Sequence, residues 1–342
     1  MRVLFLGAIA PFTTSCHRAD AIRRLGHAVT HLDPLEAFAP RLRGNGGKIH
    51  YYTGYLLLRQ SVLAWLRAAV PAQAPYDVCW VDSGELLGAH AIDYLKTQCT
   101  KVVLFNHDDP TGKRDWRRFA TLRSAIAHYD HCAVVRPFNV LEFQSFGAKD
   151  VVHVRRTYDE LAHCPPNDSP VPPKFQSDVA FIGGNIKREG RGEFLATLIA
   201  RGLPVAIWGD EWNRSRSWAT LAPHWRGPSI SGSAYVDAIR GAKLCLGLLS
   251  KQNRDEHTTR SMEIPYAGGL LCAQRTPEHT ALYIEGSEAS FWSDVDECFA
   301  VCQMLLKHDA LRAGIRAAGM RRVRQNKVGN EDLCRTLLTR AS

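Results

Sequence analysis

Two stretches, one in each half of the chain, share the same arrangement of an apolar run, a loop, a helical segment and a glycine. Residues 2–7 read RVLFLG and residues 178–183 read DVAFIG; after its first residue each run is continuously apolar, which is typical of strands buried in parallel sheets. A glycine suited to end the following helix comes nineteen positions after each strand-ending glycine, at Gly26 and at Gly202. Two βαβ openings with the same spacing predict an α/β chain of two Rossmann-like, doubly wound parallel-sheet domains.

A proline-rich stretch separates the two halves. The chain has 342 residues, more than the roughly 250–300 at which a single core stops growing, so two domains are expected. Residues 164–177 hold five prolines and few side chains that a core could bury, which indicates an interdomain linker. We predict a first domain over 1–163, a second over 178–325 that faces it across a cleft, and a helical C-terminal tail. Its last helix, over 326–342, is expected to pack back toward the first domain.

Apolar runs and helical periodicity place the remaining elements. Strands are predicted at 28–32, 76–81, 101–105, 131–135, 151–154, 205–208, 243–249 and 270–273. Helices are predicted at 17–25, 48–70, 116–127, 138–146, 192–200, 235–241 and 294–341. The apolar runs are all much shorter than the ~20 residues needed to cross a bilayer, so no membrane span is expected.

The cysteines and the net charge narrow the class of protein. Ten cysteines are scattered, mostly in apolar runs, without a C-x-x-C pair, which favours buried thiols in a reducing cytoplasm over disulfides or a metal site. The formal charge of +9 favours an anionic partner such as a nucleotide, a phosphorylated substrate or a membrane surface. Because Lys and Arg are dispersed, no nucleic-acid partner is expected. We predict a cytoplasmic protein that can contact the inner membrane face peripherally; the oligomeric state stays open.

A glycine-rich, basic loop follows the first strand of the second domain. Ligands of open parallel sheets bind beyond the carboxyl ends of strands, where this loop begins. Gly183 and Gly184 let the backbone approach a phosphate closely, and Lys187, Arg188 and Arg191 could neutralise its charge. The loop matches no established phosphate-binding motif, and a flexible surface loop is the alternative interpretation.

The motif NHDDP follows the strand predicted at 101–105 in the first domain. His107 could donate to a sugar hydroxyl or a phosphate, and Asp108 or Asp109 could orient or deprotonate an acceptor. An Asx turn before the proline would explain the second aspartate but not the histidine. Asp82 and Glu85, after the third strand, are further candidates for contacts to an acceptor.

A charged helix start precedes the small-residue turn and strand near residue 270. Thr259, Arg260 and Glu263 lie in its first turn, where unpaired backbone amides and the helix dipole favour anions. Gly268 lies in the turn that follows, and Gly209, after an earlier strand, offers a further backbone contact. These residues predict a binding site for a polar, anionic ligand. A solvated helix with an ordinary glycine cap is the alternative.

At these motifs the chain resembles a known family. Residues 178–325, through DVAFIGG, TTRSMEIPYAGGLLCA and YIEGSEASFWSDVDE, are similar to the C-terminal domain of GT-B glycosyltransferases, in particular the CgeB-like (spore maturation protein-like) group related to group-1 transferases. There an E-x7-E segment ends in a glutamate that binds the donor ribose, and Glu263 matches it. Asp255 stands where the family has the first glutamate, so the contact of that acid to the donor sugar does not carry over directly. His107 matches the histidine that faces the donor sugar in related transferases.

The resemblance implies a glycosyltransferase that uses a nucleotide-diphosphate sugar as its donor, with an acceptor domain over 1–163 and a nucleotide-sugar donor domain over 178–325. It also implies a retaining reaction without metal or other cofactor, with the basic loop neutralising the diphosphate. The acceptor, a glycan, a lipid-linked glycan or another molecule, is not specified. If the reaction inverts, Asp108 or Asp109 is the candidate base. A sugar-nucleotide 2-epimerase-like isomerase and a noncatalytic two-lobed nucleotide-binding protein are the alternatives, because fold does not determine function.

Overall fold

The computed structural model describes residues 1–70, 75–166 and 169–341, so part of the predicted linker, residues 167–168, lies outside the described residues. The chain forms two compact units. The first unit comprises Met1–Arg155, Gln252–Arg254 and the C-terminal segment from Asn330, and the second comprises Arg156–Lys251 and Asp255–Gly329. The acceptor and donor roles assigned to two domains from the sequence, with their boundaries, stay predictions.

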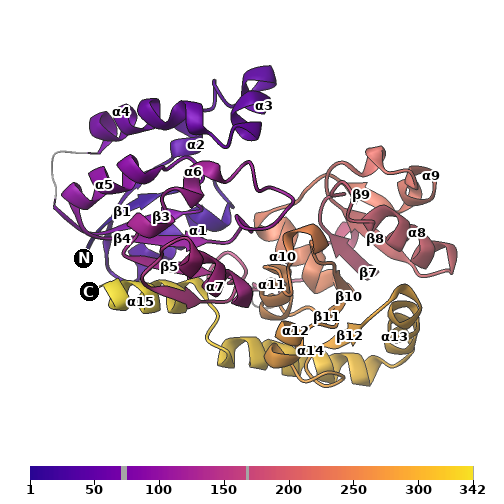
Figure 1. Cartoon of the computed structure of the whole chain (residues 1–342). Coiled ribbons are helices and arrows are strands. Elements are labelled where there is room, and N and C mark those ends of the chain that lie inside the picture. Colours follow the sequence, from indigo (N-terminus) through magenta and orange to yellow (C-terminus); the bar gives the residue numbers. More distant parts are fainter. Residues whose placement is uncertain (71–74, 167–168, 342) are drawn as a thin grey trace. The chain divides into compact units, whose positions relative to one another are not determined.

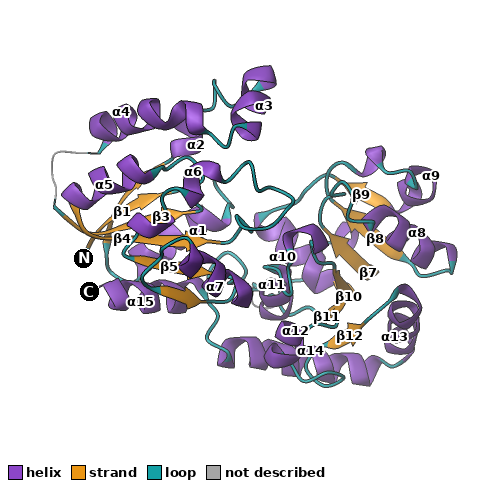
Figure 2. Ribbon diagram, viewed as in Figure 1, coloured by secondary structure: helices purple, strands orange, loops and turns teal. Residues whose placement is uncertain are grey.

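The described residues of the first unit form a six-stranded parallel sheet in the order β2-β1-β3-β4-β5-β6 (Figures 1 and 2). Its strands are β1 (Arg2–Leu6), β2 (Ala28–Leu32), β3 (Tyr76–Asp82), β4 (Cys99–Asn106), β5 (His131–Val134) and β6 (Val151–His153). Its helices are α1 (Thr14–Arg24), α2 (Pro34–Ala37), α3 (Gly44–Tyr52), α4 (Arg59–Ala69), α5 (Ala89–Gln98), α6 (Ala120–Arg123), α7 (Pro137–Ser145) and α15 (Asn330–Ala341).

The described residues of the second unit form another six-stranded parallel sheet, in the order β12-β11-β10-β7-β8-β9. Its strands are β7 (Ser177–Ile182), β8 (Val205–Trp208), β9 (Trp225–Gly227), β10 (Ala242–Gly247), β11 (Leu271–Gln274) and β12 (Ser290–Trp292). Its helices are α8 (Arg191–Ala200), α9 (Trp218–Leu221), α10 (Gly232–Gly241), α11 (Arg260–Tyr266), α12 (Pro277–Leu282), α13 (Val295–Lys307) and α14 (Asp309–Gln325). Among the described residues, no helix has the length and apolar composition needed to cross a membrane.

Both faces of the first sheet are covered, as the continuous apolar strands predict. Along β1, Leu4 packs into a core cluster with residues of α4 and α5, whereas Phe5 packs into a second cluster with residues of α1 and α15. Successive side chains of a strand point to opposite faces, so a strand between two helical layers must be apolar throughout. The second unit likewise has one core cluster on each side of its sheet. The prediction of two doubly wound domains is confirmed.

The matched glycines have the same structural role in both units. Gly26 and Gly202 follow the C-terminal ends of α1 and α8 with φ angles of 85° and 90°, a left-handed conformation that favours glycine. The amide of Gly7 donates to Leu32 at 3.0 Å, and that of Gly183 donates to Trp208 at 2.9 Å, so each continues the pairing of its strand with the next. The repeated spacing therefore marks one supersecondary unit used twice.

Several predicted helices are shorter or broken. The helix expected at 116–127 forms only α6 and a 3₁₀ turn, and that expected at 48–70 is interrupted between α3 and α4. At the interruption the carbonyl of Gly54 accepts the amide of Thr121, and a Cβ on Gly54 would lie 2.3 Å from the carbonyl of Arg117. This close backbone approach involves residues more than sixty positions apart, which local periodicity does not report. The three-residue edge strands β9 and β12 were not predicted.

Candidate functional site

The second unit holds a buried carboxylate at the start of a helix. Glu263 lies on α11, with its side chain 4% exposed. Its Oε2 accepts a hydrogen bond from the hydroxyl of Tyr235 on α10 at 2.6 Å, and its Oε1 lies 3.6 Å from Nε2 of His163. Arg260, one turn earlier, places Nη1 3.6 Å from Oε2 but keeps 39% of its side chain exposed. The pair presents a fixed acceptor and a partly exposed cation.

Tyr235 and His163 belong to this cluster although the sequence did not single them out. Burial, together with the Glu263 carboxylate, raises the pKa of Tyr235 well above its usual range, so its hydroxyl remains a hydrogen-bond donor. The two residues lie 28 and 100 positions from Glu263, and no motif spacing connects them to it. Thr259 precedes α11, where its hydroxyl accepts from Nη1 of Arg260 at 3.1 Å.

The basic loop after β7 divides into a buried anchor and an exposed part. Arg191, the first residue of α8, donates to the carbonyls of Gly184 at 3.0 Å and Leu249 at 3.3 Å, and its burial lowers its pKa. Its guanidinium therefore holds the loop, whereas Lys187 and Arg188 are exposed. Arg260 and Asp255 are close enough to affect the Arg191 pKa, which locates the loop near the α11 cluster.

Gly209 and Gly268, the other glycines predicted to lie at the ligand site, have different structural roles. Gly209, after β8, has a φ of 147°, and a Cβ there would lie 2.1 Å from the carbonyl of Gly183, so these two strand ends approach closely. Gly268 has a φ of 85° and follows the C-terminal end of α11, about two turns from Thr259. The structure thus gives Gly268 the geometry of a helix cap, away from the helix start.

Asp255 lies in a polar group of its own. Its carboxylate is 6% exposed and lies 3.4 Å from Nη2 of Arg156. The backbone amide of Arg156 also donates to Nε2 of His257 at 3.0 Å. Asp255 therefore holds the chain at the beginning of the second unit, a contact that the sequence did not predict.

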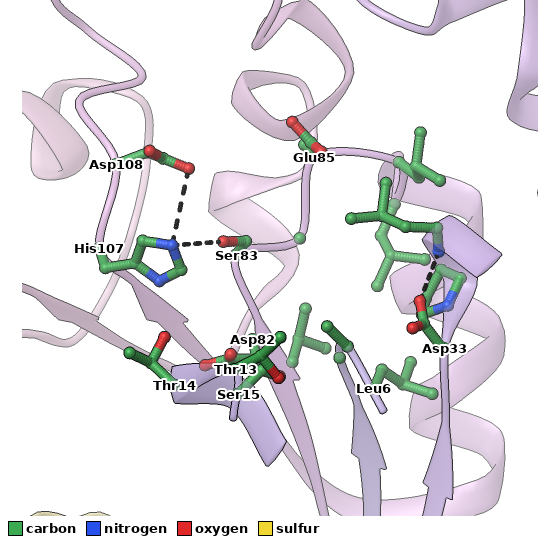
Figure 3. A pocket seen from close by; sticks show the side chains of 18 of the residues that line it. Leu6, Thr13, Thr14, Ser15, Asp33, Asp82, Ser83, Glu85, His107 and Asp108 are labelled. Atoms are coloured by element: carbon green, nitrogen blue, oxygen red, sulfur yellow. Dashed lines mark hydrogen bonds and ion pairs between the residues drawn. The ribbon is translucent and has the colours of Figure 1, made fainter. Parts of the chain in front are cut away.

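The first unit contains a cavity of about 330 Å³ beyond the carboxyl ends of β1, β3 and β4 (Figure 3). His107 lies on its wall, with Nε2 3.3 Å from the Ser83 hydroxyl and 3.9 Å from the Asp108 carboxylate. Thr13, Thr14 and Ser15, at the start of α1, also line it, as do Asp33, Asp82, Glu85 and Arg118. The cavity thus gathers hydroxyl, carboxylate and imidazole groups from several strand ends.

Two carboxylates of this lining are paired with arginines. Arg18 donates to both oxygens of Asp82, at 3.0 and 2.8 Å; burial would raise the Asp82 pKa, but the charge and hydrogen bonds of Arg18 lower it overall. Arg118 lies 2.6 Å from Oε2 of Glu85. There burial dominates, and with the nearby charge of Asp108 it raises the pKa of Glu85.

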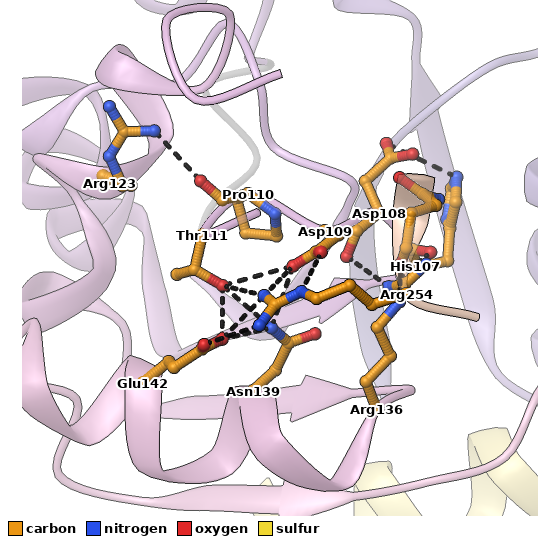
Figure 4. A network of polar contacts seen from close by, with 11 residues as sticks. His107, Asp108, Asp109, Pro110, Thr111, Arg123, Arg136, Asn139, Glu142 and Arg254 are labelled. Atoms are coloured by element: carbon orange, nitrogen blue, oxygen red, sulfur yellow. Dashed lines mark hydrogen bonds and ion pairs between the residues drawn. The ribbon is translucent and has the colours of Figure 1, made fainter. Parts of the chain in front are cut away.

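Asp109 points into a different network (Figure 4). Arg254 donates to both of its oxygens at 2.6 Å and also reaches Glu142, while Asn139 donates to Asp109 at 3.2 Å. Burial would raise the Asp109 pKa, but these donors lower it overall. The two aspartates of the NHDDP motif therefore separate: Asp108 lines the cavity, whereas Asp109 holds Arg254.

We expect Arg254→Met to destabilise the first unit, because it leaves the Asp109 carboxylate, with a side chain 1% exposed, buried without its ion pair. The expected loss in urea unfolding at neutral pH is about 2 kcal/mol, since Arg254 is partly exposed. Because the Asp109 pKa is lowered on folding, the loss should be full above about pH 4 and shrink as the pH falls below it. Arg335→Met, which breaks an exposed pair with Asp332, is the control. An equal effect of both substitutions would contradict the prediction.

Two units, each a parallel sheet with helices on both faces, define the GT-B fold. Residues 188–333, a stretch shorter than half of the chain, match the family model described as "Glycosyl transferase-like". None of the curated proteins matches this chain in sequence. The CgeB-like subgroup stays a prediction.

Solved structures match along nearly the whole chain. Sucrose-phosphate synthase from Thermosynechococcus elongatus has a TM-score of 0.70 at 14% identity, with 99% of this chain and 98% of that chain covered. HepE of Anabaena, in complex with UDP and glucose, has a TM-score of 0.69 at 12% identity, with 99% of both chains covered. A trehalose-6-phosphate synthase, a subject of work on glycosyl transfer with retention, has a TM-score of 0.65 at 13% identity, again covering 99% of both. At these identities the likeness establishes the fold.

Proposed function

We propose that this protein is a glycosyltransferase whose donor is a nucleoside-diphosphate sugar. One observation carries the proposal: buried Glu263 stands one helical turn from Arg260, whose side chain is partly exposed, near a basic loop, in a unit of a GT-B fold. A carboxylate accepts hydrogen bonds from ribose hydroxyls, and cations offset the charge of a diphosphate. The complexes of HepE with UDP and with UDP-glucose support this donor class.

In this proposal the second unit binds the leaving group. Glu263, oriented by Tyr235, accepts from the ribose hydroxyls and sets the position of the donor. As the glycosidic bond breaks, negative charge develops on the diphosphate, and fixed cations stabilise it without reorganising. Lys187, Arg188 and Arg260 are the exposed or partly exposed cations suited to this role. Arg191 acts indirectly, by holding the loop.

The first unit would supply the groups that meet the transferred sugar and the acceptor. His107 can donate to a sugar hydroxyl, and Asp108 and Ser83 lie beside it in the cavity. We propose retention of the anomeric configuration, supported by the family resemblance, and transfer without a metal or other cofactor. Should the product be inverted, Asp108 is the candidate base, because Asp109 is engaged by Arg254. The anomeric configuration of the product, read by NMR, decides between the two.

A thermal-shift screen with UDP, GDP, dTDP and ADP tests donor binding first, because it needs no acceptor. A shift with one of them, followed by turnover of the matching sugar nucleotide, is the expected result. No shift with any of the four would contradict the proposal. Conversion of the donor to an isomer without acceptor would instead identify a 2-epimerase-like enzyme, and binding without any turnover would identify a noncatalytic protein.

The charge of the cavity suggests the class of acceptor. Four carboxylates line the cavity. Two of them form ion pairs with Arg18 and Arg118, so the summed charge of these side chains is negative. The amino end of α1 adds only about half a positive charge. A phosphate group entering this cavity would be repelled by the net negative charge. Both arginines are already paired with carboxylates, so neither offsets that repulsion. We therefore propose an acceptor that presents an unphosphorylated hydroxyl-bearing group, such as a glycan end.

We expect kcat/KM to be about five- to thirtyfold higher for sugars without phosphate than for their phosphorylated counterparts, since repulsion on the order of 1–2 kcal/mol separates them. The measurement is kcat/KM for matched pairs of acceptors. Glu85→Gln should narrow the difference, because it removes one carboxylate and releases Arg118 for a phosphate. Asp93→Asn, at an exposed carboxylate outside the cavity lining, is the control. A preference for the phosphorylated member by the unaltered protein would contradict this acceptor class.

A further inference from the structure

One segment of the first unit is basic and free of acids. Residues 37–76 contain five Lys or Arg and no Asp or Glu, although acids make up 34 of the 342 residues. Within it lies α3, none of whose residues, all of them described, is buried. A surface helix normally buries an apolar stripe against the body of its domain. Here Ile49 and Tyr52 are exposed instead, and Tyr51 is only half-buried.

Large apolar side chains lie in the open along this segment. Ile49 is 56% exposed, Tyr52 65%, Leu56 41% and Leu57 65%. They follow one another over nine residues, from α3 into the 3₁₀ turn at Leu56–Leu58. Exposed apolar residues are common singly, whereas a run of this kind marks an interaction surface.

A second segment, residues 113–117, extends this surface and adds cations. Tyr52 shares a surface hollow with Trp116, which is 45% exposed, and with Lys113 and Arg117. The acid of this segment, Asp115, is buried and accepts from the Tyr51 hydroxyl at 2.7 Å. We call the following residues the α3 surface: Ile49, Tyr52, Leu56, Leu57 and Trp116, with the exposed cations Lys48, Lys113 and Arg117.

We propose that the α3 surface binds the anionic headgroup layer of a lipid bilayer. Tyr and Trp place an apolar ring and a polar tip at that depth, leucine and isoleucine enter the acyl boundary, and lysine and arginine attract anionic lipids. The core of a protein interface, in contrast, is depleted in lysine. This assignment goes beyond the proposed transfer reaction and does not depend on it.

The sequence of α3 is consistent with a helix that a membrane completes. It begins GNGG, and glycine costs roughly 1 kcal/mol relative to alanine within a helix. With weak helix propensity and no fully buried residue, α3 is joined to its own unit mainly through the Tyr51–Asp115 hydrogen bond. Burial of Ile49 and Tyr52 in a bilayer would supply the missing apolar environment.

Vesicle co-sedimentation of the full chain tests the proposal. We expect binding to vesicles of phosphatidylcholine containing phosphatidylglycerol, weaker binding to phosphatidylcholine alone, and release at high salt, which screens the charges. The double substitution Tyr52→Ser/Leu57→Ser should weaken partitioning by about tenfold or more, because two apolar groups no longer insert. Lys113→Gln/Arg117→Gln should cost about fivefold per cation, and only on anionic vesicles.

Leu161→Ser in the second unit is the matched control, since Leu161 is 67% exposed against 65% for Leu57. It should bind anionic vesicles like the unaltered protein. Absence of binding to anionic vesicles, or undiminished binding of Tyr52→Ser/Leu57→Ser, would overturn the proposal. So would self-association in sedimentation velocity that this double substitution abolishes, because the α3 surface would then contact a second copy of the chain. A nucleoside-diphosphate thermal shift, measured on the same samples, reports separately on the transfer function.

Discussion

Glu263→Gln is expected to remove most of the thermal stabilisation that a nucleoside diphosphate gives the unaltered protein. The substitution keeps the shape of the side chain and still allows a bond with the Tyr235 hydroxyl, so α11 should remain folded. It removes the charge that strengthens hydrogen bonds from ribose hydroxyls, which contribute roughly 1.5–3 kcal/mol when one partner is ionised. The nucleotide affinity should therefore fall about tenfold to a hundredfold.

The measurement is the thermal shift at increasing nucleotide concentrations. A ligand that binds the folded protein stabilises it according to the ratio of ligand concentration to Kd, so the titration gives Kd. Glu193→Gln, at an exposed position on α8 of the same unit, is the control and should bind like the unaltered protein. If Glu263→Gln binds as tightly as the control, the assignment of Glu263 to the ribose is wrong. If only Glu263→Gln loses nucleotide affinity, the effect belongs to this site, because Glu193→Gln removes a negative charge from the same unit as well.

His107→Ala is expected to reduce kcat about a hundredfold or more while leaving nucleoside-diphosphate binding nearly unchanged. His107 belongs to the cavity of the first unit, whereas Glu263 and the basic loop belong to the second. A positioned hydrogen-bond donor or proton donor typically contributes a factor of 10²–10⁴ to the chemical step. Loss of that group should therefore appear in turnover and spare the equilibrium binding of the leaving group.

Two assays on the same variant test this expectation. Turnover of the sugar nucleotide with acceptor present gives kcat, and the nucleotide titration gives Kd. His90→Ala, at an exposed position on α5 outside the cavity lining, should alter neither. Unchanged turnover in His107→Ala would remove it from the catalytic groups. A loss of nucleotide binding in His107→Ala would assign it to the donor nucleotide instead.

The candidate residues that the sequence singles out are those attached to regular elements. His107 and Asp108 follow β4, and Glu263 follows a polar loop into α11, so their locations come from periodicity and chain direction. The side chains that contact Glu263 and Asp109 are different in kind. Tyr235, His163 and Arg254 contribute through contacts between segments 28 to 145 residues apart, and nothing in local spacing announces them.

The adjacent pair Asp108 and Asp109 shows the limit of sequence reasoning within one motif. Both were candidates for the same chemical role, because a carboxylate at a strand end can serve as a base. In the structure Asp108 lines the cavity and Asp109 pairs with Arg254, so neighbouring residues have different environments. The choice depends on which way each side chain points after the strand ends, and on an arginine that arrives from a distant loop.

The amino-acid sequence by itself determined that this chain builds two doubly wound parallel sheets. Two buried strands, each followed nineteen residues later by a left-handed glycine, express local rules of apolar burial and helix termination that need no knowledge of distant residues. Only the tertiary structure decided which charged side chains are engaged in contacts within the protein and which keep exposed surface. Arg191 holds a loop, Asp82 and Asp109 hold arginines, and Lys187 and Arg260 keep exposed surface. Charge pairing acts through space, and the pairs join segments that the fold alone brings together.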